Sequence, residues 1–265
     1  MTETTKVRIT FDTNVCNVIH NPDKWPTLVA PDDARKIRAA ISDGRIGGFV
    51  SEATLFVECL SFSDKLAYLA LVGTPDPRPA PDSKMVAMFD DLASIGMKLL
   101  HAPLIGAEKF AESIPWAQDA VYPIEERQSR FSDFIRPLPG QGPLQTYGRS
   151  LLANQPPVPS RRSIRTGSCS FSVSIAQDWA IAIKREWDGN PSGQKALEKV
   201  VRPVIGEWCD GLIVGSHVGY GNDIFCTADQ GKTAGRNSLL HPTNRANLVG
   251  VRIMTPKDVV QHLSL

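Results

Sequence analysis

The sequence predicts an α/β protein of three layers, α/β/α, in which helices cover both faces of a mostly parallel central sheet. Two observations predict this class. Short runs of β-forming residues alternate along the chain with stretches whose apolar residues recur at helical spacing. The 265 residues, 42% of them hydrophobic, are also enough to bury a hydrophobic core.

The N-terminal segment begins with this alternation. Residues 7–11 form the first predicted strand, because β-forming side chains alternate there and the run stops at Asp12. A helix follows, in which Val15, Val18 and Ile19 recur at helical spacing.

The next helix and strand repeat the pattern. Asp32 or Asp33 is expected to cap the helix, and Gly44 is expected to close it. Residues 46–50 are typical of a short buried strand, and Ser51 is expected to cap the helix that comes after it.

The middle of the chain loses this regularity. We predict one domain over residues 1–265, in which residues 61–173 form a large inserted segment of helices and loops punctuated by Gly and Pro. Residues 85–95 and 107–119 have helical patterns within it. Residues 160–172 carry three arginines among Ser, Thr and Gly, which predicts a mobile basic loop.

The C-terminal part returns to the α/β pattern. Apolar stripes predict helices over residues 175–187 and 197–208, and strands follow at residues 224–227 and 251–253. Residues 255–258 combine an N-cap threonine, a proline and an acid, which predicts the start of a final helix.

Charge and cysteine usage exclude several classes of protein. The 29 Lys and Arg against 28 Asp and Glu give a net charge of +1, so any attraction for a polyanion must be local. Five scattered cysteines without a C-x-x-C pair predict neither a disulfide framework nor a zinc ribbon. Because we find no apolar leader and no apolar stretch of about 18 residues, we expect a cytoplasmic protein without a membrane anchor.

Acidic side chains follow the predicted strands. Asp12 and Asp229 come directly after strands, Glu58 lies one helical turn past another, and Asp210 opens the helical stretch that leads to the strand before Asp229. In a parallel sheet, sites form at the carboxyl ends of the strands, so four carboxylates could converge there. The structural alternative for each acid is that it caps the next helix or turn.

Five segments resemble the PIN domain family in their order and local context. They are residues 11–15 (FDTNV), 50–58, 210–214, 222–229 with its Thr-x-Asp ending, and 251–258. The resemblance covers about residues 6–60 and 174–265. It implies a PIN-like fold and a hydrolase: a Mg²⁺- or Mn²⁺-dependent nuclease, specifically an endoribonuclease that cleaves RNA phosphodiester bonds.

The resemblance also assigns roles to single residues. The acids of the family's site correspond to Asp12, Glu58, Asp210 and Asp229. Asp12 is then the central metal ligand, Asp210 and Asp229 are ligands beside it, and Glu58 is a ligand or holds water at the metal. Asn14 and Thr227 would orient these acids. Clustered carboxylates and a hard divalent cation suit one another chemically, because the cation offsets the repulsion between the acids.

Two choices remain open at the level of sequence. Glu52 competes with Glu58 for the second acidic position, and we favour Glu58 because Glu52 falls in the first turn of its helix, where an acid complements the dipole. Several cations could contact RNA phosphates or could simply be solvated. They are Arg161, Arg162, Arg165, Lys232, Arg236 and Arg245.

Two classes of function are therefore compared. The first is a PIN-type endoribonuclease with RNA as substrate, which could be the toxin of a toxin-antitoxin module with an antitoxin protein as partner. A homodimer is expected by resemblance. The second is a catalytically inactive binding or scaffold protein of the same fold, in which the acids are structural. A Ser-His-Asp hydrolase is not supported, because the chain lacks the Gly-x-Ser-x-Gly motif.

Overall fold

One all-parallel sheet organises the protein. The computed structural model describes residues 6–54, 60–65, 83–101, 122–135, 184–185, 187–231, 238–245, 248 and 250–265. Within these residues the strand order is β3-β2-β1-β4-β5, and every neighbouring pair is parallel. The strands are β1 (Val7–Phe11), β2 (Ile46–Ser51), β3 (Lys98–Leu100), β4 (Ile224–Cys226) and β5 (Ile253–Met254). The predicted parallel sheet is confirmed.

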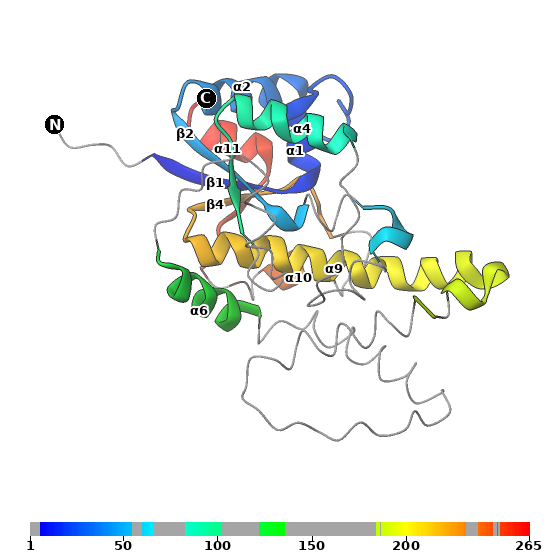
Figure 1. The fold of residues 1–265 in the computed structure, drawn as a ribbon. Coiled ribbons are helices and arrows are strands. Elements are labelled where there is room, and N and C mark those ends of the chain that lie inside the picture. Colours follow the sequence, from blue (N-terminus) through cyan, green and yellow to red (C-terminus); the bar gives the residue numbers. More distant parts are fainter. Residues whose placement is uncertain are drawn as a thin grey trace.

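Helices lie on both faces of this sheet, so the described part of the chain has three α/β/α layers (Figure 1). One face is covered by α1 (Thr13–His20), α2 (Pro31–Ser42), α4 (Ser83–Ser94) and α11 (Pro256–His262). The other is covered by α6 (Ile124–Ile135) and α9 (Gln194–Tyr220), with the short α10 (Pro242–Arg245) on the same side. None of the helices within the described ranges has the length and apolar character needed to cross a membrane.

The central strand β1 shows why the sheet is buried on both sides. Its residues Ile9 and Phe11 are 0% exposed and belong to the apolar core that includes side chains of α1, α2, α4 and α11. Thr10 points to the opposite face, where its hydroxyl meets His217 and Asn222. Alternate side chains therefore serve two different layers, as strand geometry requires.

Two helix boundaries test the capping predictions. Neither Asp32 nor Asp33 caps α2, so that prediction is wrong: the N-cap is Ala30, the helix begins at Pro31, and both acids lie in its first turn. Proline is favoured at this first helical position because its missing N–H would have no partner there. The predicted capping box of α11 is confirmed, with Thr255 and Asp258 bonding each other's backbone amides.

The segments in the middle of the chain differ from expectation in two respects. Strand β3 lies within residues 61–173, so the segment predicted as an insertion of helices and loops contributes an edge strand to the sheet. Helix α9 continues through Pro203 and runs for 27 residues, so Asp210 lies within a helix rather than at its start. The last strand is also shifted, to residues 253–254.

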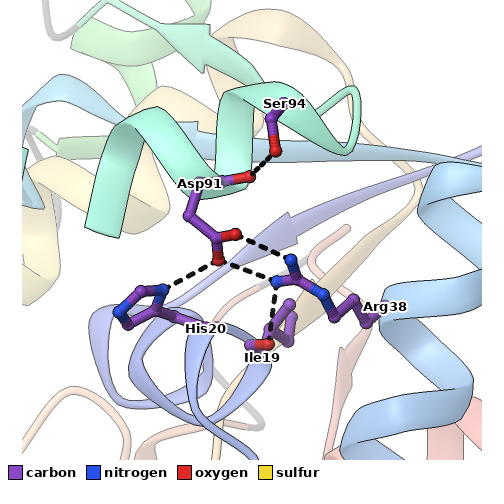
Figure 2. Close-up of polar contacts among 5 residues, drawn as sticks. All are labelled: Ile19, His20, Arg38, Asp91 and Ser94. Atoms are coloured by element: carbon purple, nitrogen blue, oxygen red, sulfur yellow. Dashed lines mark hydrogen bonds and ion pairs between the residues drawn. The ribbon is translucent and has the colours of Figure 1, made fainter. Parts of the chain in front are cut away.

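A polar cluster joins three helices at the rim of the sheet (Figure 2). Both carboxylate oxygens of Asp91 on α4 accept bonds from the Arg38 guanidinium of α2, at 2.7 and 2.8 Å. The same carboxylate lies 2.8 Å from Nδ1 of His20, at the end of α1. Arg38 above all, and His20 to a smaller extent, hold the pKa of Asp91 at about 2. This cluster ties α4 to the N-terminal helices.

Candidate acidic site

Asp12 occupies the carboxyl end of the central strand. Its backbone N–H donates to the carbonyl of Cys226 on β4 at 2.9 Å, and the residue is only 3% exposed. Oδ1 accepts from the amide of Thr13 at 2.7 Å, so Asp12 is the N-cap of α1. Oδ2 accepts from the Asn14 amide nitrogen at 2.7 Å and from the Thr227 hydroxyl at 2.5 Å. The structure therefore brings Asn14 and Thr227 onto this carboxylate.

The turn after β4 is joined to Asp12 by further hydrogen bonds. The amide of Ala228 donates to Oδ1 of Asn14 at 3.0 Å, and the amide of Asp229 donates to the Thr227 hydroxyl at 2.9 Å. The Asp229 carboxylate accepts from the amide of Gly231 at 2.7 Å. The Thr227 hydroxyl thus bonds the carboxylate of Asp12 and the main chain of Asp229.

The two acids interact electrostatically. Burial raises the pKa of the Asp12 carboxyl, and the negative charge of Asp229 adds to this effect, although the hydrogen bonds from Thr227, Thr13 and Asn14 oppose it. A buried carboxylate beside a second one is costly to ionise unless a proton or a cation compensates the charge. The pair therefore has a built-in affinity for positive charge.

Glu207 is a third acid near this edge of the sheet, and our sequence reasoning did not select it. It lies on α9, and its Oε2 accepts from the amide of Leu239 at 2.6 Å. Burial raises the pKa of Glu207, and the charge of Asp229 adds to this effect. The only signal in the sequence is its spacing, three residues before Asp210, which places both acids on one side of a helix.

The other predicted site residues are located as follows. Asp210 is half-buried within α9, and its convergence with Asp12 and Asp229 remains a prediction. Glu52 is 1% exposed, and its Oε2 lies 3.1 Å from Nδ1 of His101, the residue that follows β3. Six predicted residues lie outside the described ranges: Glu58, Arg161, Arg162, Arg165, Lys232 and Arg236.

Arg245, which the sequence left open as a phosphate contact or a solvated cation, bonds two carbonyl groups. Its Nη2 donates to the carbonyl of Asp229 at 2.5 Å, and its Nε donates to the carbonyl of Leu240 at 2.7 Å. Two of its donors are thus directed at the main chain of the candidate site.

A divalent metal fits the chemistry of the acid pair. Asp12 and Asp229 offer carboxylate oxygens, and Mg²⁺ is commonly bound through one or two carboxylates while keeping several waters. Among the residues that the structure describes, no group of three or more His, Cys, Asp and Glu side chains could hold a metal ion. A site here would therefore rest on Asp12 and Asp229 with water. Asp210 is among the described residues and does not form such a group with them as it is placed, so its part as a ligand, like that of Glu58, remains a prediction.

Comparisons with known protein families, with characterised proteins and with solved structures find no match to this chain.

Proposed function

We propose that this protein is a PIN-like endoribonuclease that uses Mg²⁺ or Mn²⁺ to hydrolyse RNA. One observation supports this proposal most strongly. The buried Asp12 carboxylate, held by Asn14 and Thr227, lies at the carboxyl edge of a parallel sheet beside Asp229, whose charge acts on it. Sites of α/β sheets form at this edge.

Each residue of the arrangement has a definable task. Thr227 and Asn14 fix the orientation of Asp12, because their donors hold the carboxylate from two directions. The Gly231 amide fixes Asp229 in the same way. A bound divalent cation would neutralise the acid pair, polarise water and stabilise the phosphate oxygens during in-line attack. In the proposed site, Asp210 and Glu58 add negative charge that strengthens cation binding.

The decisive experiment replaces Asp12 by Asn. Asp12→Asn keeps the shape but removes a charge, so cleavage of single-stranded RNA in Mg²⁺ or Mn²⁺ should fall at least about a hundredfold, or roughly 2.7 kcal/mol of transition-state stabilisation. Thermal stability should not fall by a comparable amount, because burial already disfavours the ionised form of Asp12 in the metal-free protein.

Asp223 provides the matched control. It lies at the amino end of β4, the opposite edge of the sheet, where its carboxylate accepts from the amide of Arg8 at 2.8 Å. Asp223→Asn should leave cleavage within about twofold of wild type, because a charge at the far edge does not touch the acid pair. RNA cleavage by the wild type that persists in excess EDTA would contradict the metal mechanism.

The alternative is a binding protein in which the acids are structural. It is favoured by the role of Asp12 as the N-cap of α1, since a cap needs no metal. Direct Mn²⁺ titration of the wild-type protein distinguishes the two. Binding that is lost in Asp12→Asn supports the nuclease, and absence of binding supports the alternative.

The proposal extends to biological role. A toxin of a toxin-antitoxin module would arrest growth when expressed alone, and Asp12→Asn would abolish that arrest. An antitoxin partner would protect the acid pair, and a homodimer would be detected by light scattering. Growth that is equal with and without expression of the active protein would exclude the toxin role without affecting the nuclease proposal.

A further inference from the structure

We propose that Glu207 and Arg245 are positioning residues that set the place of the Asp229 carboxylate relative to Asp12. They do so by holding residues 238–245 against the turn that carries Asp229, and we name this set of contacts the Asp229 brace. The contacts themselves are independent of the proposed function, and only the metal-binding role of Asp229 rests on it.

The first step of the brace anchors residues 238–240 to α9. Oε2 of Glu207 accepts from the amide of Leu239 at 2.6 Å, and the Ser238 hydroxyl also bonds this carboxyl. Ser238, Leu239 and Leu240 are 1%, 5% and 1% exposed, so the anchored segment is packed into the protein rather than lying on its surface. The long helix α9 thereby supplies a fixed base.

The second step passes through Arg245. Its Nε donates to the carbonyl of Leu240, within residues 238–245, at 2.7 Å, and its Nη2 donates to the carbonyl of Asp229, in the acidic turn, at 2.5 Å. A guanidinium presents its donors in a rigid planar fork, so bonding both carbonyls at once fixes their separation. Arg245 therefore links the segment to the acidic turn.

The third step is the close contact of Gly231 with the same segment. Gly231 has a φ of +66°, and a Cβ placed on it would lie 2.4 Å from the backbone nitrogen of His241. Its amide donates to Oδ1 of Asp229, and the amide of Asp229 in turn bonds the Thr227 hydroxyl that donates to Asp12. Contacts thus run without interruption from Glu207 to Asp12.

The brace has a clear physical task. The charges of Asp12 and Asp229 repel each other. The Thr227 and Asn14 side chains hold the start of the Asp229 turn, and Arg245 holds its main chain from the side of residues 238–245. With the brace in place the two carboxylates stay close before a cation arrives. Cation affinity should therefore depend on Arg245, although its own positive charge would by itself repel the ion.

The first experiment compares Arg245→Gln with Arg202→Gln in the full-length protein. Arg202 lies on α9 and pairs with Glu198 on an exposed surface, so it is a matched control for the loss of one arginine. In Arg245→Gln, hydrogen exchange of the Gly231 amide should accelerate at least about tenfold. Mn²⁺ affinity, measured by calorimetry, should weaken about 10- to 100-fold. Arg202→Gln should change neither quantity.

The second experiment separates positioning by Glu207 from direct action of its charge. Glu207→Gln retains an acceptor for the Leu239 amide, so Mn²⁺ affinity should stay within about threefold of wild type. Glu207→Ala removes the acceptor and should weaken Mn²⁺ binding about tenfold or more. Equal losses in Glu207→Gln and Glu207→Ala would overturn the positioning role, because the charge itself would then matter.

One further outcome would overturn the role of Arg245. If it contacts RNA phosphate, Arg245→Gln should lower the slope of log RNA affinity against log salt by about 0.7 and leave Gly231 exchange and Mn²⁺ affinity unchanged. Should Arg245→Gln fail to fold, Arg245→Lys keeps one donor and should give an intermediate exchange rate. If the wild type binds no Mn²⁺, the proposed function fails, while Gly231 exchange still decides whether the brace exists.

Discussion

The two faces of the sheet are stabilised in different ways. Toward α1, α2, α4 and α11, the sheet presents an almost purely apolar surface. Its buried side chains include Ile9, Val50 and Ile224 from three strands, packed with Ile37 and Leu92 from the helices. This face needs no hydrogen bonds between the sheet and the helices, because the stability gained from apolar burial depends on buried area and packing.

Toward α9 the sheet is joined by directed hydrogen bonds. The Thr10 hydroxyl accepts from Nδ2 of Asn222 at 2.8 Å and lies 3.0 Å from Nδ1 of His217. The hydroxyls of Ser51 and Ser216 lie 3.0 Å apart. All five residues are at most 8% exposed, so each polar group depends on its partner.

This difference has consequences for stability and for function. Apolar packing tolerates substitutions that conserve volume, whereas a buried polar group that loses its partner pays its full desolvation cost. Glu207 lies on α9, on the polar side of the sheet. The half-buried cluster around Asp91 lies at the rim of the apolar side. The two faces should therefore respond to different mutations and to different ranges of pH.

The largest expected effect is on the apolar face. Leu92 is 0% exposed within the core, so Leu92→Ala should destabilise the protein by about 3 kcal/mol through lost burial and the remaining cavity. Urea denaturation at pH 7.5 and at pH 5 measures this loss, which should be equal at both values. The volume-conserving control Leu92→Met should cost less than about 1.5 kcal/mol. A strongly pH-dependent loss would contradict the assignment of this face.

An intermediate effect is expected from acidification on the face toward α9. Burial lowers the pKa of His217 to about 3. Below about pH 6.5, the His217 side chain therefore becomes protonated in the unfolded chain but stays neutral in the folded protein. The stability contributed by neutral His217 is present above pH 6.5 and falls as the pH decreases, by about 2 kcal/mol at pH 5. Denaturation of wild type and His217→Gln at pH 7.5 and 5 isolates this component. An identical pH dependence of stability in wild type and His217→Gln would contradict this prediction.

The smallest expected effect comes from the cluster at the rim of the apolar face (Figure 2). The pKa of Asp91 is lowered to about 2, chiefly by Arg38, so its contribution is present above about pH 4 and is lost as the pH falls toward 2. Because these side chains are about 28% exposed, solvent screening reduces the contribution of the pair to about 1 kcal/mol. Asp91→Asn should lower stability by this amount at pH 7 and by much less at pH 2, where about half of the folded Asp91 carboxyls are protonated. An undiminished loss at pH 2 would argue against the ion pair.

The sequence allowed four of the five strands to be predicted, including the edge strand β5 with shifted bounds, but not the opposite edge strand, β3. Strand β1 could be recognised because its alternating side chains serve two buried layers and its run ends at Asp12. Strand β3 has only three residues, Lys98–Leu100, which is too short for a period to be recognised. Its place beside β2 depends on tertiary contacts that local pattern does not contain.

The candidate site divides in the same way. Asp12, Asn14 and Thr227 lie within three residues of the ends of adjacent parallel strands, so chain order and topology were enough to bring them together. Glu207 contacts Leu239 across 32 positions, and that contact depends on how α9 crosses the sheet. For Arg245 the sequence left a phosphate contact and a solvated side chain open, and the fold directs its guanidinium to two carbonyl groups.

Strand β1 pairs with both β2 and β4, so its second partner is synthesised only late in translation. The Thr227 hydroxyl bonds a carboxylate 215 positions earlier in the chain. At roughly 5–20 residues per second, a ribosome needs on the order of ten to forty seconds to cover that interval. During this time, one edge of β1 has no strand to pair with, and Asp12 lacks the contacts made by the turn that carries Asp229. A nascent chain that ends before residue 227 lacks both the Thr227 hydroxyl that bonds Asp12 and the Asp229 carboxylate, so it cannot form the proposed acid pair.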